Sequence, residues 1–168
     1  MSRDFKRKST YLLAVILLAS CASAQQPSGS TDSATATVLK VIDGDTIVLK
    51  LQNQTETVRL LGVDTPETVH PTKDVECFGP EASTFTRTML KEGAVVKLAR
   101  DVEPRDRFQR LLAYLYLADG TFFNQLLIDQ GFARNLSIEP NTTFASQFAS
   151  HESTARDRRV GLWQACER

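Results

Sequence analysis

The sequence has few of the residues that bind zinc or iron. Among its 168 residues are three cysteines and two histidines, His70 and His151, and the histidines do not lie at the spacing of metal ligands. The cysteines form no C-x-x-C motif. We therefore do not expect these cysteines to bind a metal ion.

The sequence also lacks an apolar run long enough to span a membrane. Its most apolar run has its centre at residues 11–19, far shorter than the roughly 20 residues that a spanning helix needs. Four basic residues precede this run: Arg3, Lys6, Arg7 and Lys8. This order is typical of a signal peptide. We therefore expect residues 1–20 to be a signal peptide and the protein to be exported.

Two cleavage sites follow the apolar run. Leu18-Ala19-Ser20-Cys21 resembles the bacterial lipobox, in which the signal is cut before a cysteine that then carries lipid. Cleavage after Ala22-Ser23-Ala24 is the alternative, and it would release a soluble protein. Residues 21–36 have the composition of a flexible tether. We expect a lipidated Cys21 to anchor the protein to a membrane of the cell envelope, with the domain in the periplasm or outside the cell.

With Cys21 lipidated, Cys77 and Cys166 remain as one pair in an oxidising compartment. We predict a disulfide between them, and two free buried thiols are the alternative. The disulfide would close a loop of about 90 residues and stabilise the fold by roughly 4 kcal/mol on the chain-entropy model.

Positive charge is not in excess. The formal net charge of the chain is zero, and removal of residues 1–20 leaves 16 basic and 19 acidic residues, a net charge of −3. A protein that coats nucleic acid through bulk charge would be basic. Any contact with nucleic acid must therefore come from local arginines or from a bound cation.

The domain expected at residues 37–168 contains β-branched stretches separated by turn residues. Strands are predicted at 37–42, 46–51, 56–63, 94–99 and 111–117. Helical spacing predicts helices from residue 79 to about residue 93, at 123–131 and at 142–159. This order indicates a β-rich α+β domain, a five-stranded OB-fold-like barrel with about three helices.

Three carboxylates lie at or near the ends of the predicted second and third strands. Asp45 opens the second strand, Asp64 closes the third, and Glu67 lies just beyond, so antiparallel pairing can bring them to one end of the sheet. Read singly, residues 43–46 and 64–67 are also ordinary turns. Gathered carboxylates repel each other unless a hard cation lies among them, and oxygen ligands favour calcium or magnesium.

Two arginines accompany these carboxylates. Arg59 shares a face of the predicted third strand with Leu61 and Val63, and the alternative is an arginine that extends to solvent. Arg110 precedes the fifth strand, where the alternative is a solvated charged loop, as we expect for Arg105. Arginines beside such a cluster suit a phosphodiester, because the planar guanidinium binds phosphate oxygens and stabilises transition-state charge.

Four motifs in this order resemble the staphylococcal nuclease (thermonuclease) family: Val41-Ile-Asp-Gly-Asp-Thr46, Arg59-Leu-Leu-Gly-Val-Asp-Thr-Pro-Glu67, Gly79-Pro-Glu-Ala82 and Asp106-Arg-Phe-Gln-Arg-Leu-Leu-Ala-Tyr114. The resemblance runs from about residue 36 to Trp163. It implies a calcium-dependent endonuclease that cleaves DNA or RNA and leaves 3′-phosphate ends. We also expect the protein to be a monomer.

The resemblance implies three metal ligands and three catalytic side chains. The ligands of calcium would be Asp45, Asp64 and the backbone carbonyl of Thr65. The catalytic side chains would be Arg59, Glu67 and Arg110. Of these, the glutamate would orient or deprotonate the attacking water, and the arginines would hold the scissile phosphate.

The sequence departs from the family at Gln109, where members usually have glycine, so we expect less backbone freedom and a different aim for Arg110. Two other functions remain open. A barrel of this type can bind oligonucleotides without cutting them. The protein could also be a structural envelope lipoprotein in which calcium only stabilises the fold. Metal-dependent cleavage distinguishes the nuclease from both.

Overall fold

The computed structural model describes residues 33–69, 72 and 74–166. The predicted signal peptide, Cys21 and most of the predicted tether lie outside the described residues. The last residues of that tether belong to the domain instead, because the first strand begins at Ala34. Within the described ranges, no helix has both the length and the hydropathy needed to cross a membrane.

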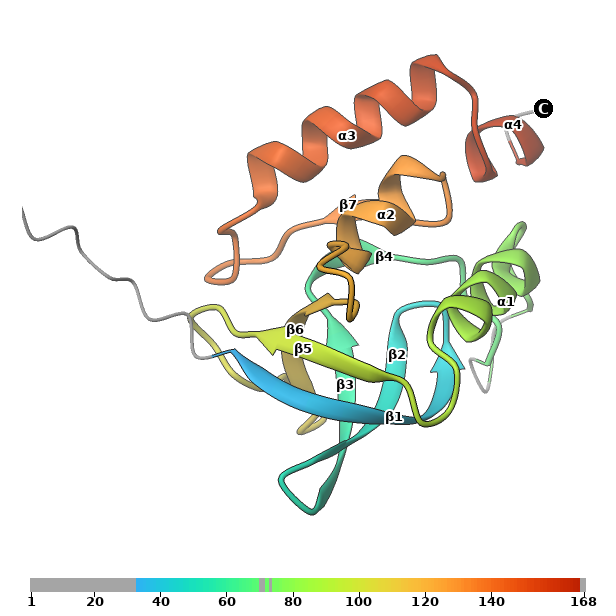
Figure 1. Cartoon of the computed structure of the whole chain (residues 1–168). Helices are drawn as coiled ribbons and strands as arrows, with labels where there is room; N and C mark the ends of the chain where they lie inside the picture. The colour runs from blue at the N-terminus through green and yellow to red at the C-terminus, as the bar shows by residue number, and fades with distance from the viewer. Residues whose placement is uncertain (1–32, 70–71, 73, 167–168) are drawn as a thin grey trace, which may run out of the picture. The chain divides into compact units, whose positions relative to one another are not determined.

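Five strands close into a barrel (Figure 1). They are β1 (Ala34–Asp43), β2 (Thr46–Leu51), β3 (Gln54–Leu60), β5 (Val95–Ala99) and β6 (Leu111–Tyr116). Their order around the barrel is β1-β2-β3-β6-β5; β3 and β6 pair in parallel, whereas the other neighbours are antiparallel. The predicted five-stranded barrel of a β-rich α+β domain is confirmed.

The core of the barrel is formed by apolar side chains at alternate strand positions. Ile47 and Leu49 of β2 and Val58 and Leu60 of β3 are buried, as the two-residue period of a strand requires. Val38 of β1 joins the same cluster. The β-branched and apolar residues that predicted these strands therefore include those that fill the barrel.

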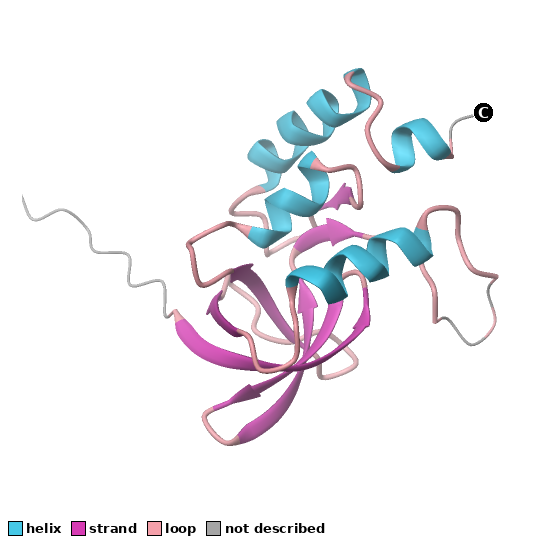
Figure 2. Cartoon of the chain, turned by 45° about the vertical axis from the view of Figure 1, so that its right-hand side comes forward, coloured by secondary structure: helices cyan, strands magenta, loops and turns pink. Residues whose placement is uncertain are grey.

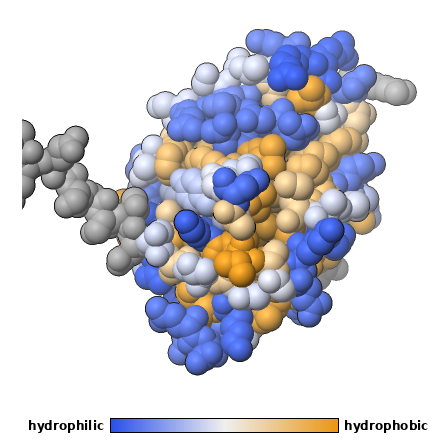
Figure 3. Space-filling model, in the orientation of Figure 1, coloured by the Kyte–Doolittle hydropathy of each residue, from blue (hydrophilic) through white to orange (hydrophobic). Residues whose placement is uncertain are grey.

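Four helices complete the domain: α1 (Gly79–Met89), α2 (Phe123–Asp129), α3 (Ala145–Asp157) and α4 (Leu162–Ala165). The first three were predicted with slightly wider limits, and α4 was not predicted. α3 packs on α2 at one end of the barrel, and α1 lies against β1 (Figures 1 and 2). On the face shown in Figure 3, hydrophobic residues lie across the middle, with hydrophilic residues above and below them.

The predicted third strand is in fact two strands. β3 ends at Leu60, and the chain bends at Gly62 (φ 72°) into β4 (Gly62–Asp64), which pairs with β7 (Arg134–Leu136). A Cβ at Gly62 would overlap the ring of Phe148 in α3, so this bend needs glycine. The prediction that Arg59 shares one continuous strand face with Leu61 and Val63 is therefore wrong.

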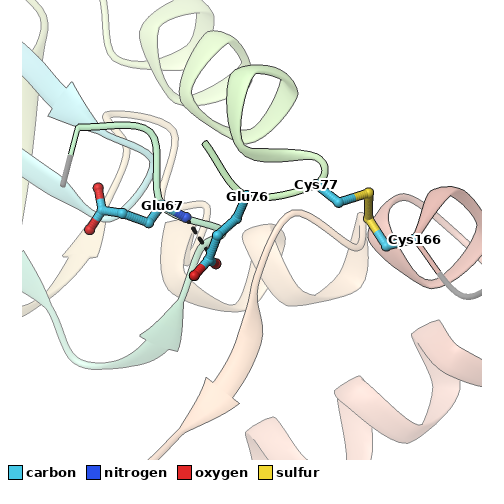
Figure 4. The surroundings of a disulfide bond; sticks show 4 residues. All are labelled: Glu67, Glu76, Cys77 and Cys166. Carbon is cyan, nitrogen blue, oxygen red and sulfur yellow. Dashed lines mark hydrogen bonds between the residues drawn. A yellow bond between two sulfur atoms is a disulfide. The ribbon is translucent and has the colours of Figure 1, made fainter. Parts of the chain in front are cut away.

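Cys77 and Cys166 form a disulfide with an S–S distance of 2.10 Å, as predicted. It joins the loop before α1 to the end of α4 (Figure 4). Leu162 and Trp163 of α4 are buried against Ala155 in a second, smaller core. The C-terminal segment is therefore held both by packing and by a covalent bond.

Candidate active site

A cavity of about 330 Å³ lies at the rim of the barrel, beside the turn between β1 and β2 and the segment after β4. All six residues predicted from the sequence line it: Asp45, Arg59, Asp64, Thr65, Glu67 and Arg110. Asp43 and Glu76 add two more carboxylates. The structure thus brings together every predicted site residue in one place.

Asp45 connects the start of β2 to the segment after β4. Its Oδ2 atom accepts hydrogen bonds from the backbone N–H and the hydroxyl of Thr65, at 3.0 and 3.1 Å. Its Oδ1 atom accepts one from the Thr46 hydroxyl at 3.0 Å. The backbone at Gly44 approaches Thr65 so closely that an added Cβ would lie 2.6 Å from its hydroxyl oxygen. These contacts fix Asp45 at the rim.

Arg59 lies between the carboxylates of Asp45 and Asp64. Its Nη2 atom is 3.2 Å from Oδ2 of Asp45 and 3.0 Å from Oδ1 of Asp64. Its Nη1 atom donates to the carbonyls of Leu60 and Val63, at 3.0 and 2.7 Å. The side chain is only 16% exposed. The alternative of an arginine that extends to solvent is therefore ruled out.

Asp64 is a carboxyl group in an acidic environment. Burial at the cavity raises its pKa, Arg59 lowers it in part, and the nearby carboxylates of Asp45 and Glu76 raise it further. The β4–β7 pairing places Arg134 opposite Asp64, and its charge also lowers this pKa. A cation bound here would reduce the electrostatic repulsion between Asp64 and these carboxylates.

Glu67 and Asp43 face each other as a carboxyl pair. Burial and the hydrogen bond with Asp43 raise the pKa of Glu67. Burial alone would also raise the pKa of Asp43, but hydrogen bonds hold it below its usual value, among them those donated by Thr68 and by the Gly44 N–H. Asp43 is therefore the more acidic partner, and Glu67 is the group poised to take up a proton.

Arg110 is held by Asp106 at the start of β6. Its Nε atom donates to Oδ2 of Asp106 at 2.7 Å, and its backbone N–H donates to Oδ1 at 2.9 Å. Gln109 adopts a positive φ of 65°, the left-handed region that suits glycine. The loop thus keeps a glycine-like conformation without glycine, and Arg110 still lines the cavity.

Arg105 lies in a solvent-exposed charged loop, as expected, but it is also ion-paired. Its guanidinium pairs with both carboxylate oxygens of Glu56, at 3.0 and 2.7 Å, and donates to the Gln109 carbonyl at 2.8 Å. It stabilises the loop that carries Arg110 rather than lining the carboxylate cavity.

A second cavity of about 610 Å³ adjoins the first and shares Arg59 and Arg110 with it. Three exposed apolar side chains contribute to its lining: Phe108, Leu136 and Ile138. The guanidinium of Arg107 lies 4.7 Å from the centre of the Phe108 ring. An apolar, partly aromatic surface beside two arginines suits a flat base next to a phosphate.

Some residues of this site were missed in the sequence. Asp106 orients Arg110; it opens the fourth motif, but no role was predicted for it. Glu76 accepts a hydrogen bond from the backbone of Glu67, which no local pattern indicates. Leu136 and Ile138 line the second cavity but resemble ordinary strand residues. Each of these roles depends on contacts formed only in the folded chain.

The oxygen donors at the rim fit a hard cation. Within the described part of the chain, no group of three or more His, Cys, Asp or Glu side chains is arranged as a metal site. Asp45 and Asp64 nevertheless both contact one nitrogen of Arg59, so they converge on a single positive group. Carboxylate oxygens without histidine or cysteine suit calcium or magnesium. A cation there would compete with Arg59 for these two carboxylates.

An OB-fold-type barrel with carboxylates and paired arginines at its rim defines a hydrolase class suited to phosphodiester substrates. Residues 57–165 match the family model described as staphylococcal nuclease homologue. The chain is 40% identical over 127 residues to the thermonuclease of Staphylococcus intermedius, covering 76% of this chain and 74% of that protein. It is 36% identical over 128 residues to endonuclease YncB of Bacillus subtilis, covering 76% and 60%. The chain belongs to the staphylococcal nuclease family and is a nuclease, acting as a hydrolase on nucleic acid.

Proposed function

We propose that this nuclease is a calcium-dependent endonuclease that hydrolyses phosphodiester bonds of DNA or RNA and leaves 3′-phosphate ends. The observation that carries the proposal is the convergence of Asp45, Asp64, Glu67, Arg59 and Arg110 on one cavity. Members of the thermonuclease family need a metal ion. The all-oxygen donor set at the rim supports calcium as that ion.

In this proposal each side chain acts on a different part of the reaction. Asp45, Asp64 and the backbone carbonyl of Thr65 hold the cation, which, when bound, neutralises phosphate charge and helps to position a water. Glu67 accepts a proton from that water as it attacks phosphorus. The bond between phosphorus and the 5′ oxygen then breaks, the 5′ oxygen takes up a proton from solvent, and the phosphate stays on the 3′ oxygen.

The two arginines stabilise the charge that develops on the phosphate. Arg59 is pre-oriented by two backbone carbonyls, and Arg110 is pre-oriented by Asp106. Guanidinium groups fixed in advance reorganise little during the reaction, so their attraction is greater for the transition state than for the bound substrate. Their shared position between the two cavities supports a role at the scissile phosphate.

We also propose that the nuclease is exported, anchored in the cell envelope by a lipidated Cys21, and monomeric. The order of basic residues, apolar run and lipobox-like sequence supports this location. Cells supplied with a labelled fatty acid are expected to label the wild-type protein but not a Cys21→Ser variant. A wild-type protein that takes up no label would contradict lipid anchoring.

The proposed cleavage is tested on single-stranded DNA with the full chain. We expect cleavage with calcium and its loss with a chelator. The 3′-phosphate ends of the products are expected to block extension by a DNA polymerase. Asp64→Asn is expected to raise the calcium concentration for half-maximal rate by about 10-fold or more, whereas Asp119→Asn, in an exposed turn, leaves it unchanged. Cleavage that survives the chelator would overturn metal dependence, and binding without cleavage would favour a binding module.

A further inference from the structure

The backbone of Glu67 is held by a residue outside the predicted motifs. The N–H of Glu76 donates to the Glu67 carbonyl at 2.9 Å. In return, the N–H of Glu67 donates to Oε2 of Glu76 at 3.2 Å, the bond dashed in Figure 4. Both backbone groups of Glu67 are therefore bonded to one residue. The Glu67 side chain points away from Glu76, toward the other side of its segment (Figure 4).

The turn that contains Glu76 also packs directly on the segment that carries Glu67. The N–H of Gly79 closes this turn by donating to the Glu76 carbonyl at 3.0 Å. A Cβ at Gly79 would lie 3.0 Å from the Glu67 carbonyl oxygen and 3.2 Å from that of Pro66. The absence of a side chain thus permits backbone-to-backbone contact, and a shift of the turn would move Glu67.

Glu76 itself is exposed, so its hydrogen bond to Glu67 competes with water. Its neighbour Cys77, however, is bonded to Cys166 at the end of α4. That helix is anchored by the buried side chains of Leu162 and Trp163. The disulfide therefore ties the residue next to Glu76 to a well-packed element distant in sequence.

We propose that Glu76 is a positioning residue for Glu67 and that the Cys77–Cys166 disulfide holds Glu76 in place. The proposal rests on the role of Glu67 in the proposed function. A dithiol reductant that supplies two electrons and two protons converts the disulfide to two thiols and is itself oxidised to a disulfide. Cys77 is exposed, so such a reductant can reach the disulfide. The reduced protein then cleaves nucleic acid more slowly than the oxidised protein.

The first test removes the acceptor from the full chain with the disulfide intact. Glu76→Ala is expected to lower kcat by about 10-fold with little change in KM, as for partners that orient a catalytic group. Glu76→Gln keeps an acceptor oxygen and is expected to recover most of that loss. Glu81→Ala, which removes the same side chain from an exposed position in α1, is the matched control and keeps the wild-type kcat.

The same series includes Glu67→Gln, which separates two kinds of failure. If Glu67→Gln cleaves at the wild-type rate, the proposed function of Glu67 is wrong. If Glu67→Gln is inactive but Glu76→Ala cleaves at the wild-type rate, only the positioning role of Glu76 is overturned.

The second test is a double-mutant cycle with the paired variant Cys77→Ser and Cys166→Ser, at a temperature where circular dichroism shows it folded. We expect its kcat to fall about as far as that of Glu76→Ala, and the addition of Glu76→Ala to lower kcat no further, because both changes act on one contact. Full kcat in the folded cysteine variant, or losses of kcat that multiply, would show that the disulfide stabilises the fold without positioning Glu67.

Discussion

At the scale of single residues, the proposed mechanism makes the rate depend on the protonation of Glu67. Burial and the neighbouring carboxyl of Asp43 raise its pKa, and a general base acts only when ionised, so kcat falls as the pH falls through that raised value. Asp43→Asn removes a negative neighbour and lowers the pKa of Glu67. At saturating calcium, we predict that the acidic limb of the kcat–pH profile moves to lower pH. An unmoved limb, or one moved to higher pH, contradicts this assignment.

Gln109 is a second residue with a testable property. Its φ of 65° places a non-glycine residue in the left-handed region, which costs about 1–2 kcal/mol. Gln109→Gly removes this strain but makes the unfolded chain more flexible. We predict a net gain of roughly 0.5–1 kcal/mol in the free energy of unfolding, measured with urea.

The matched control for that gain is Gln54→Gly in β3. Gln54 is also exposed, and its φ is not positive, so glycine there relieves no strain. This control is expected to destabilise the protein by about 0.5–1 kcal/mol. Equal effects of the two substitutions would show that the backbone at Gln109 is not strained.

At the scale of elements, the bend between β3 and β4 carries Asp64 to the rim. Gly62→Ala adds a Cβ that meets both a positive φ and the ring of Phe148. We predict a loss of about 3 kcal/mol in the free energy of unfolding, from the backbone strain and from overpacking together. Gly120→Ala, with a φ of 89° and open space around it, isolates the strain and is expected to lose only about 1–2 kcal/mol. Equal losses in the two variants would show that Phe148 does not enforce the bend.

The long elements could be predicted from the sequence because their signals are local. β-Branched stretches bounded by turn residues identified the five barrel strands, and helical spacing identified α1, α2 and α3. The three-residue strands β4 and β7 and the four-residue helix α4 are too short to show a period. The bend at Gly62 depends on Phe148, a residue distant in sequence, so no local pattern could reveal it.

The candidate site also has features that the sequence predicts and features that it does not. Asp45, Asp64 and Glu67 were predicted to meet because turns at one end of a meander are neighbours. The position of Arg59 between two of these carboxylates could not be predicted, since it requires the bend that ends β3. The contact of Glu76 with Glu67 requires the return of the chain before α1.

At the scale of the whole molecule, the titration of the carboxyl groups predicts instability in acid. Burial alone would raise the pKa values of Asp43, Asp101 and Asp106, but hydrogen bonds hold these pKa values below their usual range. The hydrogen bond from Arg105 lowers the pKa of Glu56. A lowered pKa gives stability that is present above the unfolded-state value and is lost as pH falls through the folded-state value. Asp64 and Glu67, whose pKa values are raised, act in the opposite sense.

Because more of these carboxyl groups have a lowered pKa than a raised one, we predict that the free energy of unfolding decreases as the pH falls from about 5 to about 2. Denaturation with urea at a series of pH values measures this slope. Asp101 accepts hydrogen bonds from Tyr114 and Thr143, so Asp101→Asn is expected to be less stable at neutral pH and to show a shallower slope. A stability that rises with acid, or an unchanged slope in the variant, would contradict this account.

In the proposed mechanism, Glu67 is the general base of a metal-dependent phosphodiester cleavage. The most direct measurement compares wild type with Glu67→Gln at saturating calcium, with single-stranded DNA cleavage and DNA binding followed on the same samples. We predict that the variant binds DNA as the wild type does but cleaves it about 100- to 10,000-fold more slowly, the usual contribution of a general base. Cleavage by Glu67→Gln at the wild-type rate would contradict the claim.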